Sequence, residues 1–383
     1  MSMAARREYL SVVRARYRAL ASRAAKAALL DEVIGTLGYN RKYAIRVLGQ
    51  PNAGRRSPVK RRGAHRYLAA LPAIELVWTA LDYPCAERLH PVLLSMAEQL
   101  AAHGEISLPP DVRAQLASIS RATLARRLAT MPSPKARRYT TSRGSVGLRS
   151  EIPLGRYDWD ESRPGALAVD LVEHNGGSVS GHYLCTLTVV DVVSGWSRRR
   201  GILSRGQRPV HGALTWIIAQ WPHPTWGLHS DNGSEFLSNH LSRFVRDTQI
   251  QFTRSRPYRK NDNPHAEQKN RQFVREMVGY DRFETAQQLA WLNDVYDLLD
   301  PYANLLLPSR KLIGKTRVGA HIQKRYDQAR SPFQRLCDLH ALSHETQQLL
   351  ETTRANLNPL ALHQRLAFLL CSPPAAALAT PAD

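Results

Sequence analysis

Three runs of residues typical of β-strands follow one another between positions 166 and 203, and they are the first strand-like patterns in the chain. They are ALAVDLV at 166–172, HYLCTLTVVDV at 182–192 and WSRRRGIL at 196–203. Branched and aromatic residues favour extended backbone, and turns that contain glycine separate the runs. Consecutive strands joined by tight turns predict an antiparallel meander.

Helices and strands alternate after the meander. We expect a helix near 209–220, a short strand ending in Leu228, a helix near 235–247, a strand at 249–254 and a helix from about residue 264. The two further strands predict a mixed five-stranded sheet with helices. The fold class is therefore an α/β core, which we place at 156–300.

The part of the chain before this core is predicted to be helical. Residues 1–50 are rich in Ala, Leu and Arg, and apolar residues recur at helical spacing. The pattern is interrupted at Gly38-Tyr39-Asn40 and resumes as RKYAIRVL, with Ala44, Ile45 and Leu48 on one face. A helix, a short turn and a helix predict a DNA-binding helix-turn-helix domain, and a plain α-hairpin is the alternative.

A second unit of this kind is predicted at 111–129, with a break around Ser118-Ile119-Ser120, within a helical domain at 67–130. Basic, proline-containing linkers are expected on both sides of it, at 51–66 and 131–155. The C-terminal region, 301–371, is expected to hold a small strand region at 315–327 and two amphipathic helices within 333–370. The tail, 372–383, is rich in Ala and Pro and is expected to be disordered.

Positive charge is concentrated in the N-terminal part of the chain. The net charge is +21, and residues 1–150 hold 26 Lys/Arg against 9 Asp/Glu. The segments 41–66 and 120–150 contain no carboxylate at all. Such a distribution predicts a nucleic-acid partner. The candidate DNA contacts lie on the second helix of each helical unit: Arg41, Lys42, Arg46, Arg126 and Arg127.

No apolar run is long enough to span a bilayer, which takes about 18 residues or more, and no basic-then-apolar signal opens the chain. We expect no membrane partner and a cytoplasmic, nucleoid-associated protein. The four cysteines form no C-x-x-C pair, which argues against a disulfide framework and a cysteine zinc site.

Three carboxylates occupy positions that suit catalysis. Asp170 interrupts an apolar strand, where a buried carboxylate is costly unless a cation pairs with it. Asp231 follows a short strand and opens the turn HSDNGSEF, and Glu267 lies on the helix that begins near Pro264. Carboxylates are good ligands for Mg²⁺ or Mn²⁺. Two such ions predict phosphodiester cleavage or transfer, with all three residues both catalytic and metal-binding.

Each carboxylate also has a structural interpretation. Asp170 would be a strand carboxylate bonded to backbone, Asp231 a turn residue, and Glu267 an ordinary helix-surface residue. Asp191, in VVDVVSGW, is the rival for the first metal ligand. We expect it instead to be a hairpin-turn aspartate, because using it as a ligand would break the order of the motifs.

The strings LAVDLVEHNGG, HSDNGSEF and NDNPHAEQKN resemble the core of integrase-type DDE transposases of bacterial insertion sequences. The 35 residues between Asp231 and Glu267 match the spacing typical of that family. The resemblance implies an RNase H-like fold and a DNA transposase that joins the ends of its element to target DNA. It places Asp170 on the first strand, Asp231 after the fourth and Glu267 on a helix, and joining two ends favours a homo-oligomer on DNA.

Arg271 lies four residues after Glu267 and should share its helix face, so we expect it to contact DNA. Pairing with a carboxylate of the same domain is the alternative. Lys269 should face elsewhere. Two other functions remain open at this point: an RNase H-like nuclease without strand transfer, and a DNA-binding regulator derived from a transposase.

Overall fold

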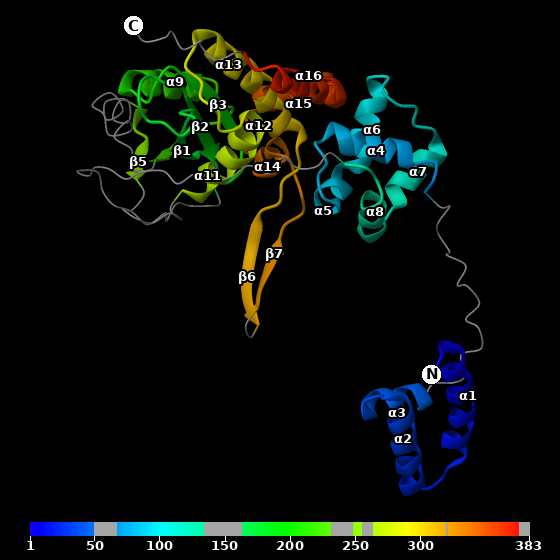
Figure 1. The fold of residues 1–383 in the computed structure, drawn as a ribbon. Helices are drawn as coiled ribbons and strands as arrows, with labels where there is room; N and C mark the ends of the chain where they lie inside the picture. Colours follow the sequence, from blue (N-terminus) through cyan, green and yellow to red (C-terminus); the bar gives the residue numbers. More distant parts are fainter. Residues whose placement is uncertain (50–66, 134–162, 231–247, 255–262, 319–320, 375–383) are drawn as a thin grey trace. The chain divides into compact units, whose positions relative to one another are not determined.

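The computed structural model describes residues 1–49, 67–133, 163–230, 248–254, 263–318 and 321–374 (Figure 1). The chain divides into two compact units, Met1–Arg66 and Tyr67–Asp383. The linkers predicted at 51–66 and 131–155, the helix near 235–247 and the tail lie wholly or almost wholly outside the described residues.

The first unit contains three helices: α1 (Met3–Ala19), α2 (Arg23–Leu37) and α3 (Arg41–Gly49). The predicted turn is present, because Gly38 ends α2 in the left-handed region at φ +67° and the Asn40 side chain accepts a hydrogen bond from the Tyr43 N–H. The break before α2, at its N-cap Ser22, was not predicted.

The inner face of α3 differs from the prediction at one position. Ile45 is 45% exposed, and Val47 is buried in its place beside Ala44 and Leu48. The helix packs against both α1 and α2. The buried residues of α3 are therefore those at 44, 47 and 48, which face the two neighbouring helices. Local periodicity alone does not distinguish this pattern from 44, 45 and 48.

The second unit begins with helices that correspond to the predicted region 67–130. They are α4 (Leu71–Ala80), α5 (Ala86–Leu89), η1 (His90–Val92), α6 (Leu93–Ala102), α7 (Pro110–Ser118) and α8 (Arg121–Leu128). The predicted break is found between α7 and α8, where Ser120 caps α8 by accepting a hydrogen bond from the Thr123 N–H.

These helices share a hydrophobic core with the C-terminal helices. The Gln99 side-chain amide donates to the carbonyls of Arg354 and Leu357, at 2.7 and 2.8 Å. The Tyr302 hydroxyl donates to the Ala80 carbonyl at 2.7 Å. Segments more than 200 residues apart in sequence therefore pack together within this unit.

The centre of the second unit is a five-stranded sheet in the order β3-β2-β1-β4-β5. The strands are β1 (Ala166–Glu173), β2 (Cys185–Asp191), β3 (Ser197–Ile202), β4 (Gly227–Ser230) and β5 (Gln251–Arg254). β1 runs antiparallel to β2 and parallel to β4, and β4 runs parallel to β5. The predicted meander and the mixed five-stranded sheet are confirmed.

Helices cover this sheet, and every residue of β2 is buried. α9 (Gln207–Ala219) packs on β2 and β3, and α13 (Ala286–Pro301) packs on β3. α11 (Pro264–Asn270) packs on β1 and β2. It continues into the π-helical turn η2 (Arg271–Arg275) and α12 (Glu276–Val278). Burial on both faces explains why β2 has no charged residue before Asp191.

The chain then leaves the sheet through the π-helical turn η3 (Tyr302–Leu306) and forms the two-stranded ribbon β6 (Leu312–Val318) and β7 (His321–Tyr326). α14 (Pro332–Asp338), α15 (His344–Asn356) and α16 (Pro359–Cys371) follow. Three helices stand where two were predicted. The extra break has a local cause, because Ser343 and Asn358 cap new helices with their side chains.

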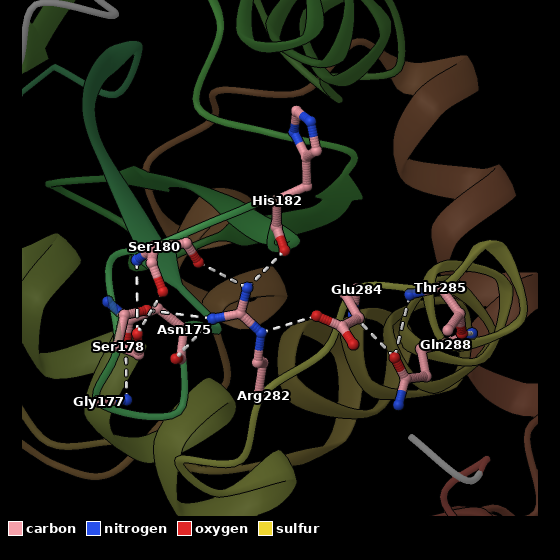
Figure 2. Close-up of polar contacts among 9 residues, drawn as sticks. All are labelled: Asn175, Gly177, Ser178, Ser180, His182, Arg282, Glu284, Thr285 and Gln288. Atoms are coloured by element: carbon pink, nitrogen blue, oxygen red, sulfur yellow. Dashed lines mark hydrogen bonds and ion pairs between the residues drawn. The ribbon is translucent and has the colours of Figure 1, made fainter. Parts of the chain in front are cut away.

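The loop between β1 and β2 is tied to the segment before α13 by Arg282 (Figure 2). Its guanidinium donates to four main-chain carbonyls of the loop, those of Asn175, Ser178, Ser180 and His182, at 2.8–3.3 Å. Gly176, at φ +59°, makes this approach possible, because a Cβ there would come within 2.8 Å of the Arg282 Cβ. Arg282 also pairs with Glu284, just before the Thr285–Gln288 capping box of α13.

Among the described helices, none combines the length and the apolar character that a membrane span needs.

Candidate active site

Asp170 lies in the central strand β1 and is half-buried. It pairs in register with Thr188 of β2. One carboxylate oxygen, Oδ1, accepts a hydrogen bond from the Leu171 N–H at 2.9 Å, as the structural interpretation of this residue expects. The other oxygen, Oδ2, is directed at α11.

Two asparagines attach α11 to β1. The Asn270 amide donates to Asp170 Oδ2 at 2.7 Å, and the Asn263 amide donates to the Val169 carbonyl at 2.9 Å. Glu267 lies four residues after Asn263 and three before Asn270, which is the spacing of one helical stripe. Asn270 and its neighbour on the buried side, Ala266, therefore define the face of α11 that lies against β1, and Glu267 is adjacent to that face.

Small residues allow this close approach. Ala266 is completely buried and clusters with Ala168 of β1 and with Val190 and Val192. A larger side chain at 266 would hold the helix away from the sheet. Glu267, the next residue, is exposed. The helix thus buries one side and presents a carboxylate at its edge.

Asp231 lies outside the described residues. The residue before it, Ser230, is the last of β4 and pairs with Val169, the residue before Asp170. Within the described part of the chain, no three His, Cys, Asp or Glu side chains are grouped as a metal site. Of the predicted trio, Asp170 lies beside the helix that carries Glu267, through its hydrogen bond with Asn270.

Asp191 is completely buried in the turn between β2 and β3. Its Oδ2 accepts the Gly165 N–H at 2.6 Å, and its Oδ1 accepts the Ser194 N–H and hydroxyl at 2.6 and 2.7 Å. Both oxygens are thus occupied, Oδ1 by the turn and Oδ2 by the residue before β1. The expectation of a hairpin-turn aspartate is confirmed.

Lys269, which was predicted to face elsewhere than Glu267 on the helix, is half-buried. Its ammonium lies 5.0 Å from the Phe273 ring centroid. Desolvation, and then the nearby positive charge of Arg199, lower the pKa of Lys269 to about 7. Replacing Lys269 would alter the packing below α11, so the exposed neighbour Gln268 is the better control.

Arg271 is 82% exposed, and its Nε lies 3.2 Å from the Glu276 carboxylate. This is the pairing within the domain that the sequence left as the alternative to a DNA contact. An exposed pair of this kind is weak, so the guanidinium can exchange it for a phosphate. A DNA contact by Arg271 stays a prediction.

The other candidate DNA contacts lie on α3 and α8. Lys42 is exposed, Arg41 pairs with Asp31, and the Arg46 guanidinium stacks 5.0 Å from the Tyr43 ring centroid. On α8, Arg126 is exposed and Arg127 is half-buried. Nothing in these positions decides between a DNA-reading helix and a plain hairpin.

Sequence reasoning missed the part played by Asn263 and Asn270. Both amides donate to β1, and both carbonyl oxygens are buried acceptors with no hydrogen-bond donor in the described part of the chain. The spacing N-x₃-E-x₂-N was the available signal, because it puts two amides on either side of the acid on one stripe.

A central strand flanked by an antiparallel and a parallel neighbour, with helices packed against the sheet, makes the core of the second unit a mixed five-stranded α/β fold. The chain belongs to the same family as the uncharacterized protein y4rM of Sinorhizobium fredii (strain NBRC 101917 / NGR234). The two are 36% identical over 338 residues, which cover 88% of this chain and 96% of y4rM.

No protein-family model matches the chain. Among solved structures, it is similar to the HTLV-2 integrase catalytic core domain in complex with magnesium, in a dimeric and a trimeric form. Both matches have 15% identity, a TM-score of 0.29 and cover 38% of this chain, and they cover 91% and 88% of the respective integrase chains.

Proposed function

We propose that the protein is a DNA transposase of the DDE type. It binds the ends of an insertion sequence, cleaves phosphodiester bonds to free 3′-hydroxyl groups and joins them to target DNA, as a homo-oligomer acting on DNA in the cytoplasm. The observation that carries the proposal is the hydrogen bond between Asn270 and Asp170. It holds α11, the helix that carries Glu267, against β1, and β1 pairs with β4, after which Asp231 follows in the sequence.

The donor set suits a hard divalent cation. Carboxylates supply the oxygen ligands that Mg²⁺ and Mn²⁺ prefer, and the buried Asn270 Oδ1 is a further acceptor beside Asp170 without a donor of its own in the described part of the chain. Asp170, Asp231 and Glu267 would hold two such ions. When bound, these supply activation of an oxygen nucleophile and stabilisation of the charge at phosphorus.

The residues of the chain itself prepare the site. Asn270 fixes the orientation of the Asp170 carboxylate, and Asn263 holds the start of α11 against β1. Orientation of this kind matters because ligands held by neighbouring hydrogen bonds need no reorganisation when they bind. The basic helices of the N-terminal part bind the element ends and keep the substrate in line with the site.

The test is an assay with DNA that carries the element ends, a target plasmid and Mg²⁺ or Mn²⁺. We expect Asp170→Asn, Asp231→Asn and Glu267→Gln each to abolish nicking and joining while end binding is retained. Gln268→Ala, an exposed change on the same helix, is the matched control and should keep normal activity.

The products separate this proposal from the alternatives. Joined plasmid products support a transposase, whereas cleavage without joining means a nuclease. Binding without either reaction means a DNA-binding regulator. Near-normal activity of Asp170→Asn would show that the first metal ligand is assigned to the wrong residue.

The double variant Lys42→Ala/Arg46→Ala in the full chain tests whether the first helical unit binds the element ends. Both side chains are exposed on α3, so the fold should be unaffected. We expect weaker binding of end DNA and a smaller dependence of affinity on salt, because fewer condensed counterions are released. Unchanged end binding would mean that α1 to α3 form a plain helical unit.

A further inference from the structure

The ribbon β6–β7 combines a high positive charge with exposed strands. The two strands carry four cations and no carboxylate: Lys315, Arg317, Lys324 and Arg325. All six residues of β7 are exposed. Figure 1 shows the ribbon as a two-stranded arm that extends away from the sheet of its own unit.

The register puts three of the four cations, Lys315, Arg317 and Lys324, on one face. Lys315 lies directly opposite Lys324, and Arg317 lies opposite Ile322. Side chains of directly opposed residues in an antiparallel pair point to the same side, with their Cβ atoms about 4.5–5.5 Å apart. Tyr326, two residues after Lys324, shares this face because side chains alternate along a strand.

Two lysines in direct opposition destabilise an isolated ribbon. Neither Lys315 nor Lys324 forms an ion pair within the described part of the chain, and no acidic residue occurs on either strand to offset the repulsion. The same face also exposes apolar surface, since Ile322 is 61% and Tyr326 40% exposed. Cations that flank side chains able to make van der Waals contacts match a groove with anionic edges and a floor of base edges, where the thymine methyl group is the apolar feature.

We infer that this face of the ribbon binds double-stranded DNA in the major groove. The inference goes beyond the proposed catalytic site and uses none of its residues. Two strands lie about 4.8 Å apart, and the major groove, about 12 Å wide, admits such a ribbon whereas the minor groove, about 6 Å wide, does not. The lysines and Arg317 meet the phosphates, and Ile322 and Tyr326 face the bases.

A second copy of the chain is the less suitable occupant. If two ribbons paired through these faces, the lysines of both would come together with no carboxylate on either ribbon. A DNA duplex supplies phosphates at both walls of the groove. Charge complementarity therefore favours DNA.

The test compares the full-length protein with Lys315→Gln/Lys324→Gln in binding a labelled 30-base-pair duplex of random sequence, followed by fluorescence anisotropy over a range of salt. We expect affinity at low salt to fall about tenfold and the slope of log affinity against log salt to become less steep by about two. Thr316→Ala/Gln323→Ala is the matched control, because this is the neighbouring cross-strand pair on the opposite face. It should bind like the wild type.

The melting temperature of the lysine variant should be equal to or higher than that of the wild type, because the like-charge pair is removed. A lower melting temperature would overturn the argument from repulsion. Wild-type affinity and slope in the lysine variant would overturn the inference and leave the proposed function standing. A wild-type protein that bound no DNA at low salt would contradict both.

A second measurement tests whether the ribbon binds in the major groove. The major groove of A-form RNA is too narrow and deep for a ribbon, so the lysine variant should lose more affinity for duplex DNA than for duplex RNA of the same sequence. Equal losses on the two duplexes would overturn binding in the groove.

Discussion

Opposite charges are paired within the five-stranded sheet, whereas the two-stranded ribbon of the same unit brings like charges together. In and under the sheet, Arg199 pairs with Asp300, and Asp191 has both oxygens occupied. On the ribbon, Lys315 faces Lys324 with no acid on either strand. A charge that is removed from water must be balanced by the protein itself, whereas an exposed excess is left for a partner to balance.

Asp170 is intermediate between the two. It belongs to the sheet, but it is only half-buried, and the Asn270 amide that reaches it carries no charge. The amide therefore orients the Asp170 carboxylate without adding a positive charge. The contrast predicts large stability effects where charge is balanced inside, and effects on activity or binding where it is not.

The largest expected effect is at the buried pair. Asp300 accepts hydrogen bonds from the Arg199 guanidinium and from its N–H. Asp300→Ala should lower the free energy of unfolding by about 3–5 kcal/mol in urea titrations, because it leaves the Arg199 cation buried without a partner. Glu98→Ala, which breaks the exposed pair with Arg113, should cost about 1 kcal/mol or less.

The double variant Arg199→Met/Asp300→Leu separates the effect of charge balance from that of packing. It removes both charges, so it should be more stable than Asp300→Ala alone. A double variant no more stable than Asp300→Ala would show that packing, and not charge balance, explains the loss.

Asn270→Ala tests the orientation of the half-buried carboxylate. Loss of a positioning hydrogen bond to a metal-ligating group typically costs 10- to 100-fold in metal affinity or activity, so about that loss of strand transfer is expected. Asn270→Ser retains a short donor at this position and should recover part of it. Calorimetric titration with Mn²⁺ separates a loss of metal binding from a general loss of fold. Unchanged metal affinity and activity would remove Asn270 from the site.

A pH effect follows from His174, which is completely buried and hydrogen-bonded at 2.8 Å to the Thr186 hydroxyl. Burial lowers its pKa from 6.5 to about 3. Below pH 6.5 the unfolded chain therefore takes up a proton that the folded chain does not. The free energy of unfolding should fall by up to about 1.4 kcal/mol per pH unit from pH 6.5 down to about pH 3.

His174→Gln should reduce the pH dependence of the free energy of unfolding by the contribution of one proton, as measured by unfolding titrations at several pH values. His344→Gln, an exposed histidine at the start of α15, is the control and should keep the wild-type slope. An unchanged slope in His174→Gln would mean that other groups cause the acid sensitivity.

The smallest effect is expected at Lys269. Desolvation lowers its pKa to about 7, so between pH 10.5 and 7 the unfolded chain binds a proton more readily than the folded chain. Stability linked to this group is therefore lost as the pH falls towards 7. Lys269→Met should raise the melting temperature at pH 7 by a few degrees at most, and by less at pH 10, because the side chain is only half-buried and its cation–π contact with Phe273 is lost. Gln268→Met, on the exposed side, should change neither.

Local sequence pattern predicted the parts of the fold that depend on neighbouring residues. The meander, the position of Asp170 in its first strand and the turn role of Asp191 follow from alternation and from turn residues a few positions apart. The turn between α2 and α3 follows in the same way from Gly38 and Asn40. The excess of positive charge is a property of composition alone.

Only the tertiary structure decided which distant residues meet. The hydrogen bond between Asn270 and Asp170 joins positions 100 apart, and the contact of Gln99 with Leu357 joins positions 258 apart. The burial of Lys269 and the opposition of Lys315 and Lys324 likewise depend on packing and strand register. Local periodicity determines which face of an element is apolar, but the partner of that face is selected by the packing of the whole unit.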